Sequence, residues 1–141
     1  MKITIRHLQG EEMLDALYTL SSYSLHSSPP FQDDQEFECG VREGTLLYIT
    51  KIPYNTKQYL AESDPTLKRY YACHCPWARE AIKNGNIRLN AVFCNCSGGF
   101  SKKPWEVIFG QTLQVDLLES ALKGDYRCRF AVHLPEKLEI E

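Results

Sequence analysis

The stretch that decides the fold covers residues 113–134 and reads LQVDLLESALKGDYRCRFAVHL. The alternating apolar residues are Leu113, Val115, Leu117 and Ala121 in the first half and Tyr126, Cys128, Phe130, Val132 and Leu134 in the second. Alternation with a period of two is typical of a strand with one buried face. The stretch therefore predicts two antiparallel strands joined by a two-residue turn at Gly124-Asp125.

That turn sets the register of the pair and places two polar side chains. Asp116 would lie opposite His133 as a surface pair. Glu119 would lie on the otherwise apolar face, diagonal to Cys128. A carboxyl buried there without a partner would have a raised pKa and would suit acid–base catalysis, whereas at the edge of the sheet it would reach water.

Turn and cap residues divide the chain before this stretch into short elements. The predicted strands cover 45–52, 70–75 and 90–96, and the predicted helices follow caps at Asn55, Cys75 and Ser101. Pro76 suits the first position of a helix and disfavours helical geometry at Cys75, which becomes the N-cap. Gly85 would end that helix, and a Ser97-Gly98-Gly99 turn would precede the next one, which ends before Gly110. Strands interleaved with short helices indicate an α+β class, an antiparallel sheet with helices packed on one face.

The chain of 141 residues is long enough for one hydrophobic core, with a boundary near residue 38. Residues 1–38 read as an N-terminal strand-helix extension that ends in an acidic linker, and residues 39–141 read as a Cys-rich α+β ligand-binding-like domain.

The extension reads ITIRHL from Ile3, EEML from Glu11 and LSSYSLH from Leu20. Over about residues 1–37 it resembles the first strand and helix of the Gcn5-related N-acetyltransferases. The Gly-rich loop that cradles the coenzyme A pyrophosphate in that family is not found in the sequence, so acetyl transfer is not expected.

Two Cys-x-Cys steps, Cys73-His74-Cys75 and Cys94-Asn95-Cys96, hold four of the six cysteines. Residues two apart in a strand face the same side, so Cys73, Cys75, Cys94 and Cys96 on neighbouring strands would converge on a tetrahedral zinc ion, with His74 facing away. The alternative is a set of inert core thiols, because free cysteine behaves as a small buried hydrophobe.

Cys75 is the best candidate for a nucleophile. The positive end of a helix favours the thiolate form of a cysteine at the N-cap. Arg79, one turn further, would stabilise that thiolate or bind a carboxylate, or would lie on an exposed face. In an enzyme, Cys75 would attack and Glu119 would carry the proton.

Aromatic residues are concentrated around these thiols and would line an apolar pocket, or else form the core. The candidate ligand-binding residues are Tyr71, Trp77, Arg79, Phe93, Trp105 and Cys128.

Three segments carry a resemblance to a known family: FCNCSGGF from Phe93, KPWEVIFGQ from Lys103 and LLESALKGDYRCRFAVHL from Leu117. Over roughly residues 40–135 the chain resembles the 4-vinyl reductase, or predicted hydrocarbon-binding, domain. The resemblance implies the fold of nitric-oxide-signalling and Golgi-transport domains, an antiparallel sheet and helices around an apolar ligand cavity. A weaker similarity, through Cys75-Pro76 and the Gly-Asp-x-x-Cys hairpin, is to amino-thiazoline carboxylate hydrolases and implies a thiol-dependent hydrolase.

Three functions stay open: a sensing or binding module for a small, mainly apolar ligand or a metal such as zinc, a thiol-dependent hydrolase, and a structural partner domain. Residues 46–108 hold nine basic and four acidic residues, but the basic ones are scattered, so nucleic acid is not an expected partner. The sequence has no apolar run near membrane-spanning length and no secretory signal, so we expect a cytoplasmic protein without membrane contact, either a monomer or a homodimer.

Overall fold

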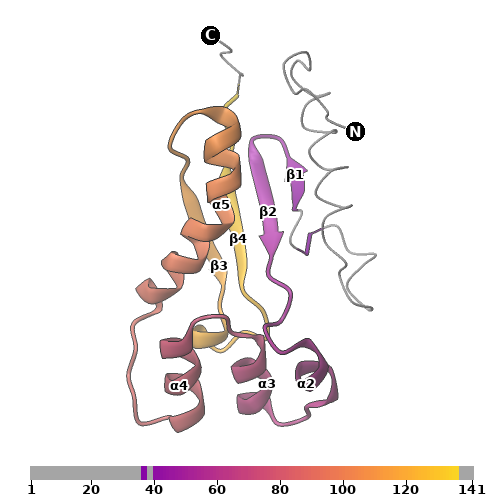
Figure 1. The fold of residues 1–141 in the computed structure, drawn as a ribbon, viewed down its shortest axis with the longest axis vertical. Helices are drawn as coiled ribbons and strands as arrows, with labels where there is room; N and C mark the ends of the chain where they lie inside the picture. The colour runs from indigo at the N-terminus through magenta and orange to yellow at the C-terminus, as the bar shows by residue number, and fades with distance from the viewer. Residues whose placement is uncertain (1–35, 38–39, 137–141) are drawn as a thin grey trace.

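The computed structural model describes residues 36–37 and 40–136, which form an α+β structure around an antiparallel sheet of four strands. The strands are β1 (Val41–Glu43), β2 (Leu46–Thr50), β3 (Val115–Glu119) and β4 (Arg129–His133). Their order across the sheet is β1-β2-β4-β3 (Figure 1), so β4 lies between β2 and β3. The predicted α+β class is therefore confirmed. The predicted strand over 45–52 corresponds to β2, and the two strands predicted within 113–134 correspond to β3 and β4.

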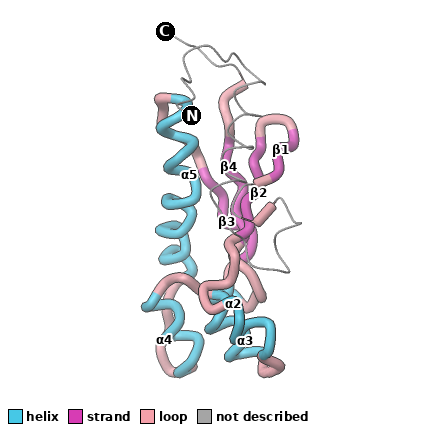
Figure 2. Tube along the Cα trace, turned by 45° about the vertical axis from the view of Figure 1, so that its right-hand side comes forward, coloured by secondary structure: helices cyan, strands magenta, loops and turns pink. Residues whose placement is uncertain are grey.

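Four α-helices and two 3-10 helices complete this part of the chain. They are α2 (Thr56–Ala61), α3 (Pro65–Ala72), α4 (Pro76–Asn84), η2 (Ala91–Cys94), α5 (Asn95–Phe109) and η3 (Ala121–Lys123). Helix α5 runs along one face of the sheet, whereas α2, α3 and α4 gather beyond one end of it (Figure 2). None of the helices within the described residues is both long and apolar enough to cross a membrane.

Proline and capping residues set the boundaries of α3 and α4. The Asp64 side chain accepts a hydrogen bond from the Leu67 amide at 2.8 Å, and Pro65 opens α3. The prediction of an extended segment over 70–75 is therefore wrong for 70–72, which are helical, and right for the junction that follows. Cys75 is the N-cap of α4 with extended geometry (φ −81°, ψ 120°), as predicted, and Gly85 ends α4 in the left-handed region at φ 64°.

The predicted strand over 90–96 and the turn at 97–99 are wrong. The Asn90 side chain accepts from the Val92 amide at 2.9 Å and starts η2, which leads directly into α5. A Cβ atom on Gly98 would lie 3.2 Å from the Phe130 ring of β4. Close packing of α5 on the sheet therefore outweighs the poor helix propensity of the glycine pair. Gly110 ends α5 as predicted.

The β3–β4 pair has a different register from the predicted one. Asp116 lies opposite Ala131, two residues from His133, its predicted partner, so each side chain keeps its face of the sheet. The connection is longer than two residues because Ser120 leaves the strand and caps η3. Its backbone amide donates to Asp125 Oδ2 at 2.8 Å, which holds this turn closed.

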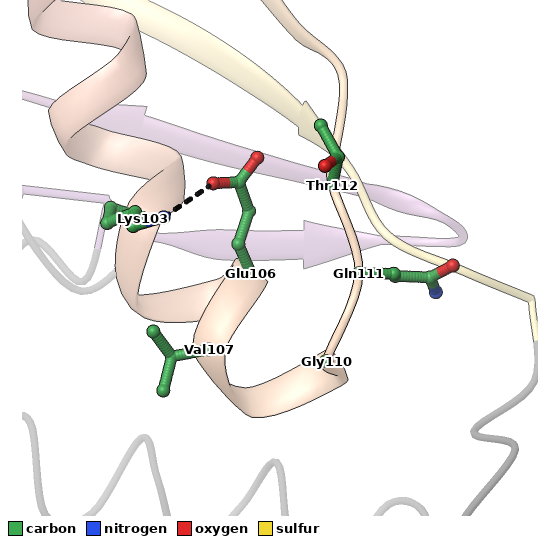
Figure 3. Close-up of a pocket in the computed structure, with 6 residues that line it drawn as sticks. All are labelled: Lys103, Glu106, Val107, Gly110, Gln111 and Thr112. Carbon is green, nitrogen blue, oxygen red and sulfur yellow. Dashed lines mark ion pairs between the residues drawn. The ribbon is translucent and has the colours of Figure 1, made fainter.

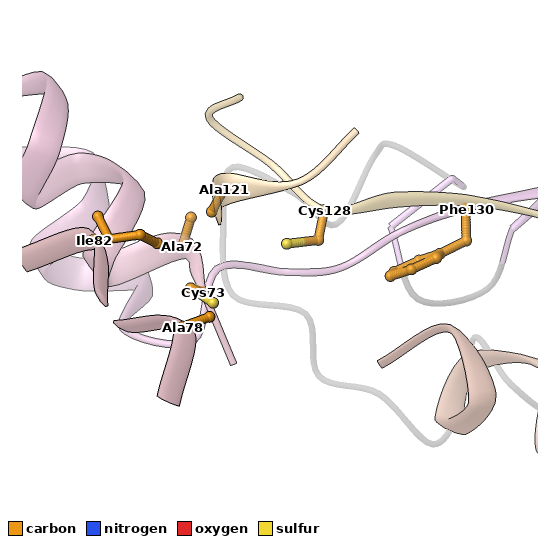
Figure 4. Close-up of a cluster of buried hydrophobic side chains, with 7 residues drawn as sticks. All are labelled: Ala72, Cys73, Ala78, Ile82, Ala121, Cys128 and Phe130. Carbon is orange, nitrogen blue, oxygen red and sulfur yellow. The ribbon is translucent and has the colours of Figure 1, made fainter. Parts of the chain in front are cut away.

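Buried side chains form two clusters. The first joins α5 to the middle of the sheet and contains Leu47, Ile49, Trp105, Leu113, Val132 and Leu134. The second joins α3, α4 and η3 to the start of β4 and contains Ala72, Cys73, Ala78, Ile82, Ala121, Cys128 and Phe130 (Figure 4). Ile108 and Phe109 pack with Trp105 in the first cluster, so these three residues form the inner face of α5.

Only Glu36 and Phe37 of the predicted N-terminal unit are described, and both contact the sheet. Phe37 forms an isolated parallel bridge with Thr50. The Glu36 carboxylate accepts a hydrogen bond from Thr50 Oγ1 at 2.8 Å and pairs with Arg129. The predicted strand and helix of the N-terminal extension, and Cys39, lie outside the described residues.

Candidate functional site: a cluster of four thiols

The fold brings four cysteines together at the end of the sheet. These are Cys73, Cys75, Cys94 and Cys128, hereafter the thiol cluster, and all four are free thiols. Cys73 and Cys75 flank the turn between α3 and α4, Cys94 ends η2, and Cys128 precedes β4. Cys73 and Cys128 belong to the second buried cluster and Cys75 packs against it, and the thiols of Cys75, Cys94 and Cys128 each contribute to the raised pKa of Cys73. Three of the four come from the predicted Cys-x-Cys steps.

Burial separates one thiol from the other three. Cys73, Cys94 and Cys128 are buried, whereas Cys75 is half-buried. Burial raises the pKa of the Cys73 thiol to about 12, and it also raises the pKa values of Cys94 and Cys128. The three buried thiols are therefore neutral near pH 7, and Cys75 is the member of the cluster that solvent reaches.

Cys96 does not belong to the cluster. Residues two apart in a helix are rotated by about 200° relative to each other, and Cys96 is exposed while Cys94 is buried. The strand geometry behind the predicted zinc site is therefore wrong for this step. Within residues 36–37 and 40–136, no group of three or more His, Cys, Asp or Glu side chains is arranged to hold a metal ion.

Cys75 lies where α3 ends and α4 begins, and its side chain makes no capping hydrogen bond. Its carbonyl oxygen accepts from the Arg79 amide at 2.9 Å and lies 3.8 Å from Cys73 Sγ. His74 Nε2 lies 2.7 Å from the carbonyl oxygen of Ile52, so its ring is engaged with residues outside the thiol cluster. The Cys73-His74-Cys75 turn thus directs both cysteines to the second buried cluster, where both pack.

The Arg79 side chain is held by aromatic rings. Its guanidinium carbon lies 4.7 Å from the centre of the Tyr54 ring and 4.3 Å from that of Tyr70, and Nη2 donates to Asn55 Oδ1 at 2.9 Å. This use of Asn55 explains why its side chain does not cap α2, although it occupies the predicted N-cap position. Arg79 therefore links α4 to α3 and to the residues that directly precede α2.

Ser120 was not among the sequence candidates, yet its hydroxyl lies 3.1 Å from Cys94 Sγ. That oxygen also accepts hydrogen bonds from the Leu122 amide at 3.1 Å and the Lys123 amide at 3.3 Å. A hydroxyl has two lone pairs and one proton, so with both lone pairs engaged its proton points to the sulfur. The Ser-Ala-Leu-Lys-Gly pattern, a cap residue followed by a short helix and glycine, is the sequence signal for this position.

Of the two placements predicted for Glu119, the buried carboxyl without a partner and with a raised pKa is wrong. Its two carboxylate oxygens each accept a hydrogen bond from the Arg127 guanidinium at 2.8 Å. These bonds outweigh partial burial and hold the pKa of Glu119 below its usual range. The carboxyl therefore stays ionised at neutral pH. Asp116 and His133 do pair, at 2.6 Å, but diagonally across the strands.

The predicted ligand-binding residues lie in different parts of the described structure. Trp77 and Phe93 are 74% and 47% exposed, whereas Trp105 is buried in the first cluster beneath α5. Tyr71 is half-buried, and its ring packs edge-on against that of Tyr70 at 5.3 Å. Of the six residues, only Cys128 belongs to the thiol cluster.

An open hollow of about 220 Å³ lies at the end of α5 (Figure 3). Its lining residues are Lys103, Glu106, Val107, Gly110, Gln111 and Thr112. The Glu106 carboxylate there pairs with Lys102 at 2.7 Å and Lys103 at 3.6 Å and accepts from the Leu113 amide at 3.0 Å. The polar group at the centre of this hollow thus fastens α5 to the start of β3.

Residues 54–138 match a protein family described as a family of unknown function, DUF6144. The chain belongs to this family. The region shared with DUF6144 begins after β2 and includes all four thiols of the cluster, Ser120 and Arg79. The searches of curated proteins and of solved structures gave no significant match.

Proposed function

We propose that this protein is a thiol-based sensing module in which Cys75 reacts with a low-molecular-weight disulfide. The observation that carries the proposal is the unequal burial of four thiols, of which Cys75 is half-buried and the other three are buried. A purely structural group of core cysteines has no need of a member at the surface.

The position of Cys75 suits an attacking sulfur. It opens a nine-residue helix, and the positive end of a helix stabilises negative charge. No capping hydrogen bond occupies its side chain. The Cys75 thiolate attacks one sulfur of the disulfide, a new S–S bond forms, the old S–S bond breaks, and the displaced thiolate takes a proton from water.

The same thiol would serve the hydrolase that the weaker resemblance implies. That reaction also needs a proton carrier, and the predicted one, Glu119, is ionised and bonded to Arg127. Disulfide exchange needs no such residue, which is why we favour it. The ligand-binding fold implied by the stronger resemblance stays a prediction.

Oxidised glutathione serves as the probe. The reduced full-length protein is incubated with it at pH 7.5, and peptide mass spectrometry follows every cysteine separately. We expect Cys75 to be modified before Cys73, Cys94 and Cys128, and at least as fast as the exposed Cys96. The Cys75→Ser variant should leave the thiol cluster unmodified, and Cys96→Ser, the matched control, should not change the rate at Cys75. Slower reaction at Cys75 than at Cys96, or no reaction, would rule the function out.

A further inference from the structure

We propose that Cys73 is the resolving thiol of this site, so that the mixed disulfide on Cys75 is converted into a disulfide between Cys73 and Cys75. This inference rests on the proposed function and extends it, because it names the second protein thiol of the sensing reaction and the form in which that reaction ends.

The backbone of the Cys73-His74-Cys75 turn directs both cysteine side chains to one side. Cys73 is extended at φ −75° and ψ 135°, and Cys75 is extended at φ −81° and ψ 120°. Successive side chains of an extended segment point to opposite sides. His74 follows this alternation, since its Nε2 lies 2.7 Å from the carbonyl oxygen of Ile52 and its ring packs edge-on against Tyr54. Both cysteines pack instead with the second buried cluster.

Two observations bring the Cys73 sulfur close to Cys75. Cys73 Sγ donates a weak hydrogen bond to the carbonyl oxygen of Cys75 at 3.8 Å, so it already lies against the residue that it would attack. Cys73 is a member of the second cluster (Figure 4), and the half-buried Cys75 packs against that same cluster. The two side chains therefore share one packed environment, with Cys75 on its solvent side.

The chain itself keeps the two residues within reach of a disulfide. Cα atoms two residues apart in an extended segment are separated by about 6.6 Å, and disulfides span about 4.4–6.8 Å between Cα atoms. The Cβ atoms must still approach to about 3.8 Å, so the backbone has to rotate at His74. The hydrogen bonds that anchor the turn lie at its outer ends, from the Cys73 amide to Arg69 at 3.1 Å and from the Arg79 amide to Cys75 at 2.9 Å. Rotation at His74 can therefore leave both in place.

The other two buried thiols come from separate elements. Cys94 is not a member of the second cluster, and its sulfur lies 3.1 Å from the Ser120 hydroxyl. Cys128 belongs to the cluster but enters it from the start of β4 (Figure 4). A disulfide from Cys75 to either residue would link two elements of the packed core, whereas a disulfide to Cys73 needs a rotation within one turn.

The resolving step balances without a further reactant. The Cys73 thiol loses its proton to water, and its thiolate attacks Cys75 Sγ in the mixed disulfide. The Cys73–Cys75 bond forms, the bond from Cys75 to the substrate sulfur breaks, and the second substrate thiolate leaves and is protonated. One small disulfide is reduced to two thiols, and two protein thiols are oxidised to one disulfide.

Burial controls the rate of this step. Burial raises the pKa of Cys73 to about 12, and the thiols of Cys128, Cys94 and Cys75 raise it further, so a small fraction of Cys73 is thiolate near pH 7. The short tether offsets this, because a group held beside its target reacts as though it were present at a very high concentration. We expect closure to be about tenfold faster at pH 8.5 than at pH 7.5, in proportion to the thiolate. A closure rate that does not change with pH would contradict attack by this buried thiol.

The experiment treats reduced full-length protein with oxidised glutathione, quenches the reaction with acid, alkylates the free thiols and maps the cysteines after trypsin digestion. Trypsin releases residues 70–79 as the single peptide YYACHCPWAR, because Arg69 and Arg79 mark its two ends. Closure of the disulfide lowers the mass of this peptide by two hydrogen atoms, whereas a disulfide to another cysteine joins it to a second peptide. Wild type should end with the closed form of the 70–79 peptide and no bound glutathione.

Substitutions of the buried thiols test the role of Cys73 directly. Cys73→Ala should stop with one glutathione on Cys75, and the first reaction at Cys75 should keep its rate, which also reports that the variant is folded. The matched variants Cys94→Ala and Cys128→Ala, also changes of a buried thiol, should close as wild type does.

The outcomes separate the two proposals. Glutathione that stays on Cys75 in wild type, or a cross-link from the 70–79 peptide to another peptide, would overturn the role of Cys73 and leave Cys75 as the reactive thiol. No reaction of Cys75 in wild type would overturn both. Should Cys73→Ala fail to fold, the mass of the 70–79 peptide from wild type decides the question alone. Stoichiometric zinc that protects Cys73 and Cys75 from oxidised glutathione would also overturn both.

Discussion

Arg79 shows how one side chain holds three elements. It extends from α4 between the ring of Tyr70 on α3 and the ring of Tyr54, which precedes α2, and it bonds to Asn55. Its Nε is buried without a hydrogen-bond partner among the described residues. This unmade bond costs stability and offsets part of the gain from the two rings.

Replacing Arg79 with methionine should destabilise the protein by about 1–2 kcal/mol, because two cation–π contacts and one hydrogen bond are lost while the stem volume is kept. Urea unfolding followed by circular dichroism measures the change. Lys83→Met is the matched control, since Lys83 lies one turn further along α4, is exposed, and its Nζ is 5.4 Å from the Tyr70 ring centre. Equal losses in both variants would contradict the bridging role of Arg79.

Among the elements, α5 is the one that tertiary packing determines most strongly. It contains two glycines and Pro104 within fifteen residues, a composition that disfavours a helix. Gly98 faces the sheet, with Phe130 and Val115 close to where a side chain would begin, whereas nothing lies within 4 Å of the same position on Gly99. The two neighbouring glycines therefore have different roles.

Gly98→Val should destabilise the protein by about 1–3 kcal/mol, because the added side chain forces α5 away from β4. Gly99→Val should change the stability by roughly 0.5 kcal/mol or less, since its side chain meets open space. Thermal unfolding of both variants tests the difference. A similar melting temperature for the two would show that the close approach of α5 to Phe130 does not limit packing.

At the scale of the whole molecule, long-range polar contacts fasten the start of the described chain to the centre of the sheet. Glu36 pairs with Arg129 of β4 and accepts from Thr50 of β2. Burial alone would raise the pKa of Glu36, but the hydrogen bonds from Arg129 and Thr50 outweigh it and lower the pKa. The ionised carboxylate therefore contributes to the stability of the sheet.

The lowered pKa of Glu36 predicts that the free energy of unfolding decreases at acidic pH. Because the folded protein binds the Glu36 proton less readily than the unfolded chain, its contribution is present above the unfolded pKa of about 4.3 and is lost as the pH falls through the folded value. At pH 7, the Glu36→Gln variant should have a free energy of unfolding about 1–2 kcal/mol lower than that of wild type. Between pH 6 and pH 3, the free energy of unfolding of the variant should fall less than that of wild type. Urea unfolding at each pH measures both.

Glu43→Gln, a change of an exposed glutamate in β1, serves as the control and should follow the wild-type profile. An unchanged acid dependence in Glu36→Gln would show that the Glu36–Arg129 pair does not stabilise the fold. Asp116, Glu106 and Glu119 also have lowered pKa values, so some loss at low pH should remain in every variant.

Local chemistry in the sequence determined the α+β class, the strands near residues 46–50 and 115–133, the start of α4 at Pro76 and the helix ends at Gly85 and Gly110. Each follows from a rule that acts over a few residues: alternation, the missing amide of proline, or the left-handed freedom of glycine. The sequence prediction did not include the caps at Asp64, Asn90 and Ser120, each of which accepts a hydrogen bond from a backbone amide at the start of the helix that follows.

Only the tertiary structure decided which thiols meet. The sequence pairs Cys94 with Cys96 because a strand repeats every two residues, but packing of Gly98 against Phe130 makes this segment helical and turns Cys96 outward. Cys128 joins the cluster instead, since β4 begins beside the junction of α3 and α4, and Ser120 reaches Cys94 because η3 packs against η2. These contacts join residues far apart in the chain, and no local pattern determines them.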